Sequence, residues 1–275
     1  TALKMDYFKI PASELGKDSK IPVYPLGDSG EVFYELAHEM VNTIKEHIAA
    51  GEKTVFICPV GPVGQYPIFV RLVNRDRVSL KNCWFINMDE YLNDDGTYID
   101  IESPLSFRGF MRNNVYTKID PELLMPEEQR VFPDPADPGK VDALIEKLGG
   151  VDIAFGGIGI NGHLAFNEAQ PELSAEEFAK LGTRTLTLTP ETKTANAIGD
   201  RGGAIIAMPN KAVTIGIKQI ISARKVRLGV FRDWHRGVVR QAAYGEVSAA
   251  FPVTLLQNHP DAAIFANATA SALPF

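Results

Sequence analysis

Hydrophobic residues along this chain recur with two periods, which predict two kinds of element. Between Ser29 and Ala50 they return at steps of three and four residues, which predicts an amphipathic helix. Ser29 can cap the first turn of this helix, and Gly51 can end it. The apolar positions that define it are Val32, Phe33, Leu36, Met40, Ile44 and Ile48.

Short, continuous apolar runs elsewhere predict strands that are buried on both faces. They cover residues 54–60, 83–88, 151–155, 226–231 and 261–266. Helical patterns occupy 67–74, 106–115, 140–148, 233–244 and 248–256, and strand-like patterns occupy 184–189 and 211–217. The turn-rich 93–101 and the proline-rich 121–138 are typical of surface segments. This alternation predicts an α/β fold with a doubly wound, mostly parallel sheet and helices on both faces.

Composition narrows the class of protein. The chain has 275 residues, of which 45% are hydrophobic and 23% charged, which excludes disordered and collagen-like proteins. A net charge of −6 argues against a nucleic-acid partner. No apolar stretch reaches ~18 residues, so we expect no membrane span, and no signal-peptide pattern opens the sequence. Cys58 and Cys83 lie in apolar runs and predict buried, reduced thiols, as expected of a cytoplasmic protein.

Open parallel sheets bind ligands beyond the carboxyl ends of their strands, so residues that directly follow strands are the first candidates. After the first apolar run comes Gly61-Pro62-Val63-Gly64, whose backbone N–H groups can approach an anion. A tight turn between strand and helix explains these residues equally well. After the second run come Asp89 and Glu90. Loss of solvent there can raise the pKa of one carboxyl and make it a usable base, with a helix cap or a solvated turn as the alternative.

The third run leads into a glycine-rich segment at 156–168 that contains His163, Asn167 and Glu168. Glycine frees the backbone for close approach to a ligand. Histidine side chains titrate near neutral pH, so His163 is a candidate proton shuttle that Glu168 can orient. A histidine packed for structural reasons alone is the alternative.

Other chemistries lack their motifs. The sequence has no HExxH, no CxxC and no His/Cys cluster with metal spacing, so we expect no metal site. It also has no GxSxG segment, which argues against a serine hydrolase. The remaining histidines are expected at helix surfaces, at a helix start and in a turn; they are His38, His47, His235 and His259.

Two of these segments resemble the signature segments of the glucosamine-6-phosphate deaminase (isomerase) family. They are Phe-Ile-Asn-Met-Asp-Glu-Tyr at 85–91 and Gly-Ile-Gly-Ile-Asn-Gly-His-Leu-Ala-Phe-Asn-Glu at 157–168. The Phe-Asn-Glu at 166–168 favours the deaminase branch over the related 6-phosphogluconolactonases. Residues 187–189 and 192–196 resemble the family's lid, and 212–217 and 256–260 also fit.

The resemblance extends over about residues 30–267. It implies a single catalytic α/β domain over 1–275, with an N-terminal extension at 1–28 and an active-site lid at about 188–211. It also implies an enzyme that converts an amino-sugar phosphate to a ketose phosphate and ammonia without a cofactor.

The resemblance implies a role for each matching residue. Asp89 would move a proton between C2 and C1 of the open-chain sugar, His163 would open the ring by delivering a proton to the ring oxygen, and Glu168 would hold His163. The residues implied to hold the phosphate or substrate are Gly61, Pro62, Val63, Gly64, Glu90, Gly162 and Arg236. Arg184 aligns with a basic residue that binds effectors in regulated members, and Arg201 is a candidate auxiliary residue.

Three departures from the family pattern affect these expectations. Asn161 stands where the family has an Asp, which removes a negative charge two residues from His163 and leaves Glu168 as its carboxylate partner. We therefore include Asn161 among the catalytic candidates. The loop at Gly61–Gly64 lacks the family's hydroxyl residues, and Ile198 stands where the lid usually carries a phosphate-binding Arg, three residues before Arg201.

The sequence thus supports one leading hypothesis and two alternatives. The leading hypothesis is an amino-sugar phosphate deaminase/isomerase that acts on a substrate like glucosamine 6-phosphate. The first alternative is a 6-phosphogluconolactonase-like hydrolase that uses His163 to activate water and does not need Asp89 as a carbon base. The second is a non-catalytic sensor of sugar phosphates, in which Asn161 marks lost chemistry. The expected partner is a small sugar phosphate, and self-association into a homo-oligomer is left open.

Overall fold

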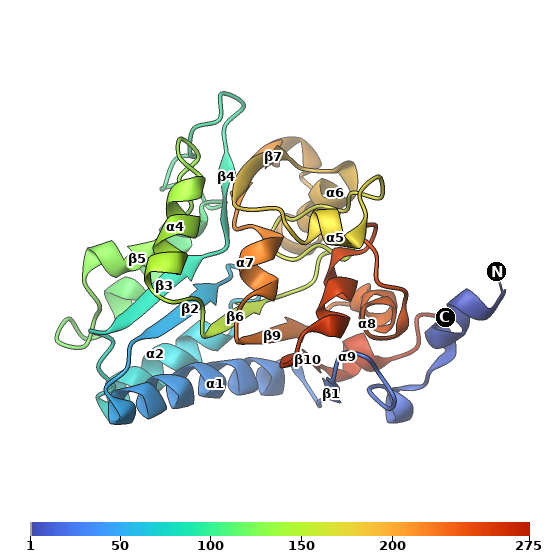
Figure 1. The fold of residues 1–275 in the computed structure, drawn as a ribbon, viewed down its shortest axis with the longest axis horizontal. Helices are drawn as coiled ribbons and strands as arrows, with labels where there is room; N and C mark the ends of the chain where they lie inside the picture. Colours follow the sequence, from blue (N-terminus) through green and yellow to red (C-terminus); the bar gives the residue numbers. More distant parts are fainter. Residues whose placement is uncertain (1) are drawn as a thin grey trace.

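The computed structural model describes the backbone of residues 2–275 and the side chains from residue 6 onward. Within this part of the chain, a seven-stranded sheet crosses the molecule in the order β1-β10-β9-β6-β2-β3-β5, and every neighbouring pair is parallel (Figure 1). Its strands are β1 (Val23–Pro25), β2 (Thr54–Cys58), β3 (Cys83–Asn87), β5 (Arg130–Val131), β6 (Ile153–Gly156), β9 (Lys225–Val230) and β10 (Ala262–Ala266). The predicted α/β fold with a mostly parallel sheet is confirmed.

Alternating side chains of the central strands enter two separate hydrophobic cores. Val55 and Ile57 of β2 belong to the core on one face, and Phe56 and Cys58 belong to the core on the other. All five residues of β2 are buried. A strand covered on both faces needs apolar residues at every position, which is why these strands appear in the sequence as continuous apolar runs.

Helices cover both faces of the sheet (Figure 1). One core takes side chains from α1 (Ser29–Ala50), α2 (Gln65–Asp76) and α3 (Phe107–Asn114). The opposite core takes them from α4 (Gly139–Lys147), α5 (Ala175–Phe178), α7 (Ile217–Ile221) and α8 (His235–Tyr244). The short α9 (Ala268–Ser271) follows β10.

The ends of α1 agree with its predicted range, although its cap differs. Asp28, and not Ser29, is the N-cap residue, because its side chain accepts the backbone N–H of Glu31. Gly51 ends the helix in the left-handed conformation at φ 70°, as predicted. Ile48 was predicted on the apolar face but is 49% exposed, because it lies beyond the edge of the core.

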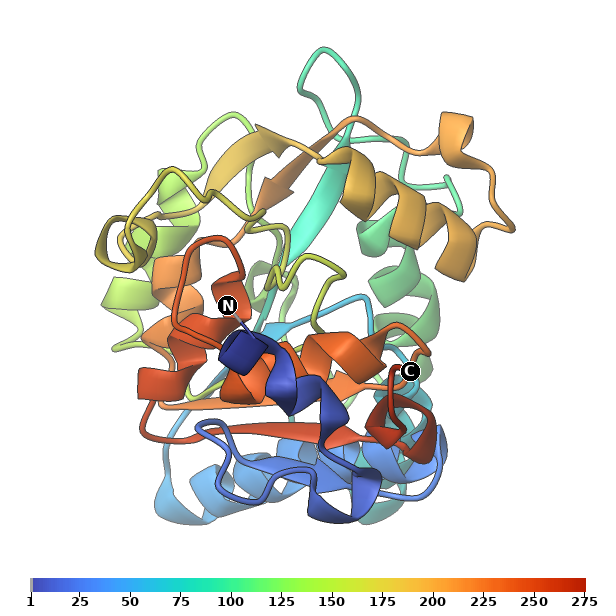
Figure 2. The same ribbon diagram turned by 90° about the vertical axis from the view of Figure 1, so that its right-hand side faces the viewer.

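A second, three-stranded antiparallel sheet lies beyond the carboxyl ends of the main strands. It consists of β4 (Asp89–Leu92), β8 (Lys211–Thr214) and β7 (Arg184–Thr187), in the order β4-β8-β7. Figure 2 shows this small sheet at the top of the molecule with helix α6 (Pro190–Asp200) beside it. Asp89 and Glu90 therefore begin a strand, so the alternative of a helix cap or a solvated turn at this place does not hold.

Three other segments differ from the sequence prediction. The N-terminal segment contributes β1, an edge strand that pairs with β10. The predicted surface segment 121–138 contributes β5, which pairs with β3. The predicted helix at 248–256 is a 3₁₀ helix over Pro252–Asn258, because Pro252 and the turn at Ser248–Phe251 delay its start. The further 3₁₀ segments are Ala2–Lys9, Ala12–Glu14, Tyr116–Lys118, Glu127–Gln129 and Ile205–Ala207.

Candidate functional site

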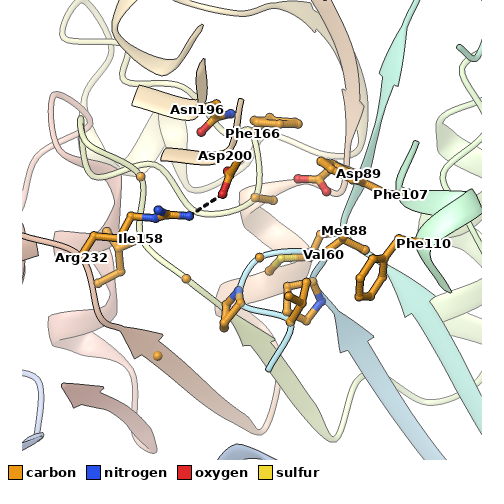
Figure 3. A pocket seen from close by; sticks show the side chains of 18 of the residues that line it. Val60, Met88, Asp89, Phe107, Phe110, Ile158, Phe166, Asn196, Asp200 and Arg232 are labelled. Atoms are coloured by element: carbon orange, nitrogen blue, oxygen red, sulfur yellow. Dashed lines mark hydrogen bonds and ion pairs between the residues drawn. The ribbon is translucent and has the colours of Figure 1, made fainter. Parts of the chain in front are cut away.

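A cavity of about 600 Å³ opens where the main sheet meets the small sheet. Its walls come from the loops after β2, β6 and β9, from the start of β4 and from α6. This is the edge at which an open parallel sheet is expected to bind its ligand. Aromatic side chains form much of the lining (Figure 3); they are Phe33, Tyr91, Phe107, Phe110, Phe166, Phe231 and Trp234.

Asp89 lies in this cavity as the first residue of β4. Its backbone is held by pairing with Thr214 of β8, and Figure 3 shows its carboxylate between Phe107 and Phe166. The residue is only 7% exposed, and in the described part of the chain its carboxylate accepts no hydrogen bond. Burial, and secondarily the neighbouring charge of Glu90, raises the pKa of the Asp89 carboxyl well above its usual range. An unpaired carboxylate in an apolar wall is suited to accept a proton from a substrate.

Glu90 points to the opposite side of β4 and does not line the cavity. It is fully buried and accepts hydrogen bonds from the backbone N–H groups of Phe107 and Arg108 at the start of α3. It also accepts from the Ser106 hydroxyl and pairs with the Arg108 guanidinium at 3.1 Å. Since successive side chains of a strand point to opposite faces, Glu90 anchors α3 while Asp89 faces the ligand space. The predicted place of Glu90 in the substrate site was wrong.

The glycine-rich loop after β6 places His163 in the same cavity. A Cβ atom on Gly159 would lie 2.0 Å from Cε1 of the imidazole, so only glycine leaves room for the ring there. The ring Nδ1 donates to Asn161 Oδ1 at 2.7 Å and lies 3.2 Å from Glu168 Oε1. Among residues 6–275 no hydrogen bond reaches Nε2, so this nitrogen is available to a ligand.

Glu168 is held from two sides behind the imidazole. Its carboxylate accepts the Thr192 hydroxyl at 2.6 Å and the Thr189 backbone N–H at 2.9 Å, both from the start of α6. Burial alone would raise the pKa of this carboxyl, but the hydrogen bond and charge of His163, with the two threonine contacts, lower it to about 2. Glu168 is therefore an ionised partner that fixes both the imidazole ring and the start of α6.

The loop after β2 forms the cavity floor through Gly61, Pro62, Val63 and Gly64, with a cis peptide bond between Gly61 and Pro62. It offers backbone groups and no hydroxyl side chain. Phe33 covers Gly64 so closely that a Cβ there would lie 2.2 Å from the phenyl ring. Any anion at this floor would have to use backbone N–H groups at the start of α2 together with a cation from another loop.

Three predicted binding residues lie outside the cavity. Arg236 donates to the Thr269 carbonyl and pairs with Asp233, so it ties α8 to the C-terminal segment. Gly162 has φ +79° and faces the Phe251 ring, which a Cβ would approach to 2.6 Å. Arg184 binds the side-chain oxygen of Asn167 at 2.8 Å, beside the small sheet. Arg201 does line the cavity, and its guanidinium donates to the Pro104 carbonyl.

Sequence reasoning missed one cation of the site. Arg232 lines the cavity and pairs with Asp200 at 2.6 Å. His235 holds this loop: its Nδ1 accepts the backbone N–H of Arg232, and its Nε2 donates to the Ile158 carbonyl. Burial is the main cause that lowers the pKa of His235 to about 4, so the ring is neutral. Arg232 directly follows the apolar run at 226–231, which is the signal that would have singled it out.

Within the described residues, no group of three or more His, Cys, Asp and Glu side chains is arranged to hold a metal ion. None of the described helices is long and apolar enough to cross a membrane. Cys58 and Cys83 are both buried and free, as the apolar runs predicted.

Comparison with known proteins identifies similar sequences over most of the chain. A glucosamine-6-phosphate deaminase of Lachnoclostridium phytofermentans is 30% identical over 237 residues, which is 83% of this chain and 93% of the relative. One of Bacteroides fragilis is 31% identical over 245 residues, 86% of this chain and 85% of the relative. No family model matches the chain.

Solved structures agree with these sequence relatives. A monomeric glucosamine-6-phosphate deaminase superposes with a TM-score of 0.78 at 28% identity, covering 91% of this chain and 99% of that one. A 6-phosphogluconolactonase of Trypanosoma cruzi superposes with a TM-score of 0.63 at 17% identity, covering 90% of this chain and 95% of that one. The second likeness concerns the fold alone.

Proposed function

Because the chain belongs to the glucosamine-6-phosphate deaminase family, we propose that it converts an amino-sugar phosphate, such as glucosamine 6-phosphate, to a ketose phosphate with release of ammonia. One observation carries the proposal beyond family membership. Within residues 6–275, a carboxylate without a hydrogen-bond partner, Asp89, and an imidazole whose Nε2 has none, His163, face one cavity. Those two groups are what an aldose–ketose conversion of a cyclic sugar requires.

His163 performs the ring opening. Its Nδ1 is held by Asn161 and Glu168, so Nε2 faces the sugar. Nε2 takes the proton of the anomeric hydroxyl and delivers a proton to the ring oxygen as the ring C–O bond breaks. The product is the open-chain aldehyde with its amino group at C2. Asn161 keeps the ring oriented through a neutral hydrogen bond, where a carboxylate would also add charge.

Asp89 performs the carbon chemistry. Its carboxylate removes the proton at C2 and returns it to C1, while the aldehyde oxygen gains a proton and the amino group gives one up. The amino aldehyde thereby becomes an imine at C2 with a hydroxyl group at C1. One water molecule then adds to the imine, and ammonia leaves to give the ketose. The raised pKa of Asp89 supports this role, because a carboxyl with a raised pKa is the stronger base. The aromatic wall around it limits competition from bulk water.

We propose that the phosphate lies between the backbone N–H groups of Gly61, Val63 and Gly64 and the guanidinium of Arg232. Arg232 takes the part that the sequence assigned to Arg236, since Arg232 lines the cavity and Arg236 does not. Arg201 is an auxiliary contact from the segment after α6. We further propose that residues 188–211 act as a lid, because α6 carries Asn196 and Asp200 in the cavity wall.

A cytoplasmic location also remains a proposal. The two buried, free cysteines support it, since reduced thiols are typical of reducing compartments. Self-association stays a prediction that light scattering of the purified protein would test.

The proposed activity is tested by measuring ammonia and ketose release from a panel of substrates. The panel contains glucosamine 6-phosphate, unphosphorylated glucosamine and 6-phosphogluconolactone. We expect turnover of glucosamine 6-phosphate by the wild-type protein and loss of turnover in Asp89→Asn. Equal ammonia release by the two proteins would refute the role of Asp89. Lactone hydrolysis without ammonia release would assign the chain to the hydrolase alternative, and sugar-phosphate binding without turnover would assign it to the sensor alternative.

A further inference from the structure

Both cationic side chains that line the cavity are already engaged by the protein itself. Arg201 donates to the Pro104 carbonyl at 2.7 Å and to the Asp200 carbonyl at 3.1 Å. Arg232 donates to Asp200 Oδ1 at 2.6 Å and to the Gly199 carbonyl at 3.3 Å. Of the two histidines in the wall, His235 is neutral because its ring is buried, and His163 is the proposed ring-opening group. A phosphate that enters the cavity therefore meets no arginine side chain that is free of a protein partner in the described residues.

The ion pair between Arg232 and Asp200 joins two separate parts of the cavity wall. Figure 3 shows the Arg232 guanidinium reaching across to Asp200 at the end of α6. The guanidinium lies so close to the α6 backbone that a Cβ on Gly199 would be 2.9 Å from Nη1. Asp200 is the more exposed partner, with a side chain 53% exposed against 29% for Arg232. Water can therefore solvate Asp200 when the pair separates, so separation costs little.

The two partners differ in how firmly they are held. The backbone of Arg232 is fixed by its hydrogen bond to the buried His235 ring at 3.0 Å. Asp200 is the last residue of α6 and is followed by Arg201 and by two glycines with positive φ, Gly202 and Gly203. When the ion pair breaks, Asp200 and the end of α6 are thus the part that can move, while Arg232 stays in the cavity.

We propose that Asp200 is a specificity-determining residue that competes with the substrate's phosphate for Arg232. This inference rests on the proposed function, because it takes the phosphate of an amino-sugar phosphate as the competing anion. A phosphate monoester carries almost two charges near neutral pH and matches the guanidinium fork with two oxygens, so it displaces a single exposed carboxylate. A sugar without a phosphate has no anionic group that can replace Asp200 on Arg232, so the ion pair stays intact. Asp200 therefore lowers the affinity for all anions and leaves only dianions able to bind well.

The inference is tested by titrating inorganic phosphate into the wild-type protein, Asp200→Asn and Arg232→Met, with binding measured by calorimetry. Asp233→Asn is the matched control: it removes the same charge one residue from Arg232, but Asp233 lies outside the cavity and pairs with Arg236. We expect Asp200→Asn to bind phosphate roughly two- to fivefold more tightly, the range that exposed ion pairs span. Arg232→Met should lose most of the binding, and Asp233→Asn should match the wild type.

Unchanged or weaker phosphate binding in Asp200→Asn overturns the inference, as does undiminished binding in Arg232→Met. Thermal unfolding of each variant distinguishes a loss of binding from a loss of folding. Phosphate binding does not need turnover, so an inactive wild-type protein would refute the proposed function and leave this measurement valid. If the protein is active, the Michaelis constant for glucosamine 6-phosphate should fall in Asp200→Asn while that for unphosphorylated glucosamine stays unchanged.

Discussion

Replacing Asp89 by Asn should abolish catalysis and stabilise the fold at the same time. Asp89 is 7% exposed and its carboxylate accepts no hydrogen bond within the described residues, so ionising it in the folded protein costs free energy. Asparagine has nearly the same shape and no charge. We expect a gain of about 1–2 kcal/mol in the free energy of unfolding, the usual size when a strained functional residue is removed. For a chain of this size that is a rise of about 2–8 °C in the melting temperature.

The pH dependence of this gain follows from the direction of the pKa shift. Burial raises the pKa of Asp89 in the folded protein, so the unfolded chain releases this proton first. The folded state is therefore penalised as the pH rises above about 3.8, the ordinary value for this side chain. Below that pH the wild-type carboxyl is neutral in both states. The advantage of Asp89→Asn should thus be present near neutral pH and disappear in acid.

Glu90→Gln provides a matched control, because it makes the same chemical change at the adjacent residue. Glu90 is also buried, but it accepts hydrogen bonds from the start of α3 and pairs with Arg108. Removing one partner of such a buried pair typically costs about 3–5 kcal/mol, so this variant should be destabilised.

Activity and stability are measured on the wild-type protein and on both variants. Ammonia release should fall by about 10²–10⁴-fold in Asp89→Asn, the contribution of a general base. Chemical denaturation from acid to neutral pH gives the free energies of unfolding. A variant that is less stable than the wild type near neutral pH would show that Asp89 is not an unpaired buried charge, and a variant that retains turnover would show that Asp89 is not the base.

Three further predictions concern the imidazole and its neighbours. Asn161→Asp should raise the deaminase kcat by roughly tenfold, or about 1.4 kcal/mol of transition-state stabilisation, because it returns a negative charge beside His163. An unchanged kcat in a folded variant would show that position 161 does not limit the chemistry. At pH values above 4.5, the ordinary pKa of this side chain, ionised Glu168 should stabilise the fold by roughly 3 kcal/mol, and this contribution is lost as the pH falls toward about 2. The difference in free energy of unfolding between the wild type and Glu168→Gln should therefore narrow below about pH 4.5, and a difference that stays constant there argues against the ionised pair. Gly159→Ala should lower kcat by about tenfold or more, because the new methyl group would lie 2.0 Å from Cε1 of the His163 ring and displace the ring. Circular dichroism should show that the variant is folded, and full activity would mean that the position of the ring does not matter.

Local patterns were enough to predict most elements of the main sheet and several site residues. Strands buried on both faces need apolar residues at every position, and a helix with one buried face needs them at every third or fourth, so β2, β3, β6 and α1 are visible in the sequence. Glycine clusters and polar residues at strand ends indicated Asp89 and His163, because the carboxyl ends of parallel strands share one edge. The edge strands β1 and β5 were missed because they are short and only partly apolar.

Contacts between distant segments decided the rest of the site. Asp89 and Glu90 are adjacent acidic residues that the sequence does not distinguish. Only the pairing of β4 with β8 determines that Asp89 faces the cavity and that Glu90 anchors α3. Arg236 and Arg232 are equally basic, but the turn held by His235 sends Arg232 into the cavity while Arg236 binds the C-terminal segment. The direction in which a side chain points depends on how the whole chain packs, and the type of the residue carries no information about that direction. The chemistry that the chain can perform was therefore readable from its residues, whereas which side chains meet the ligand depended on long-range packing.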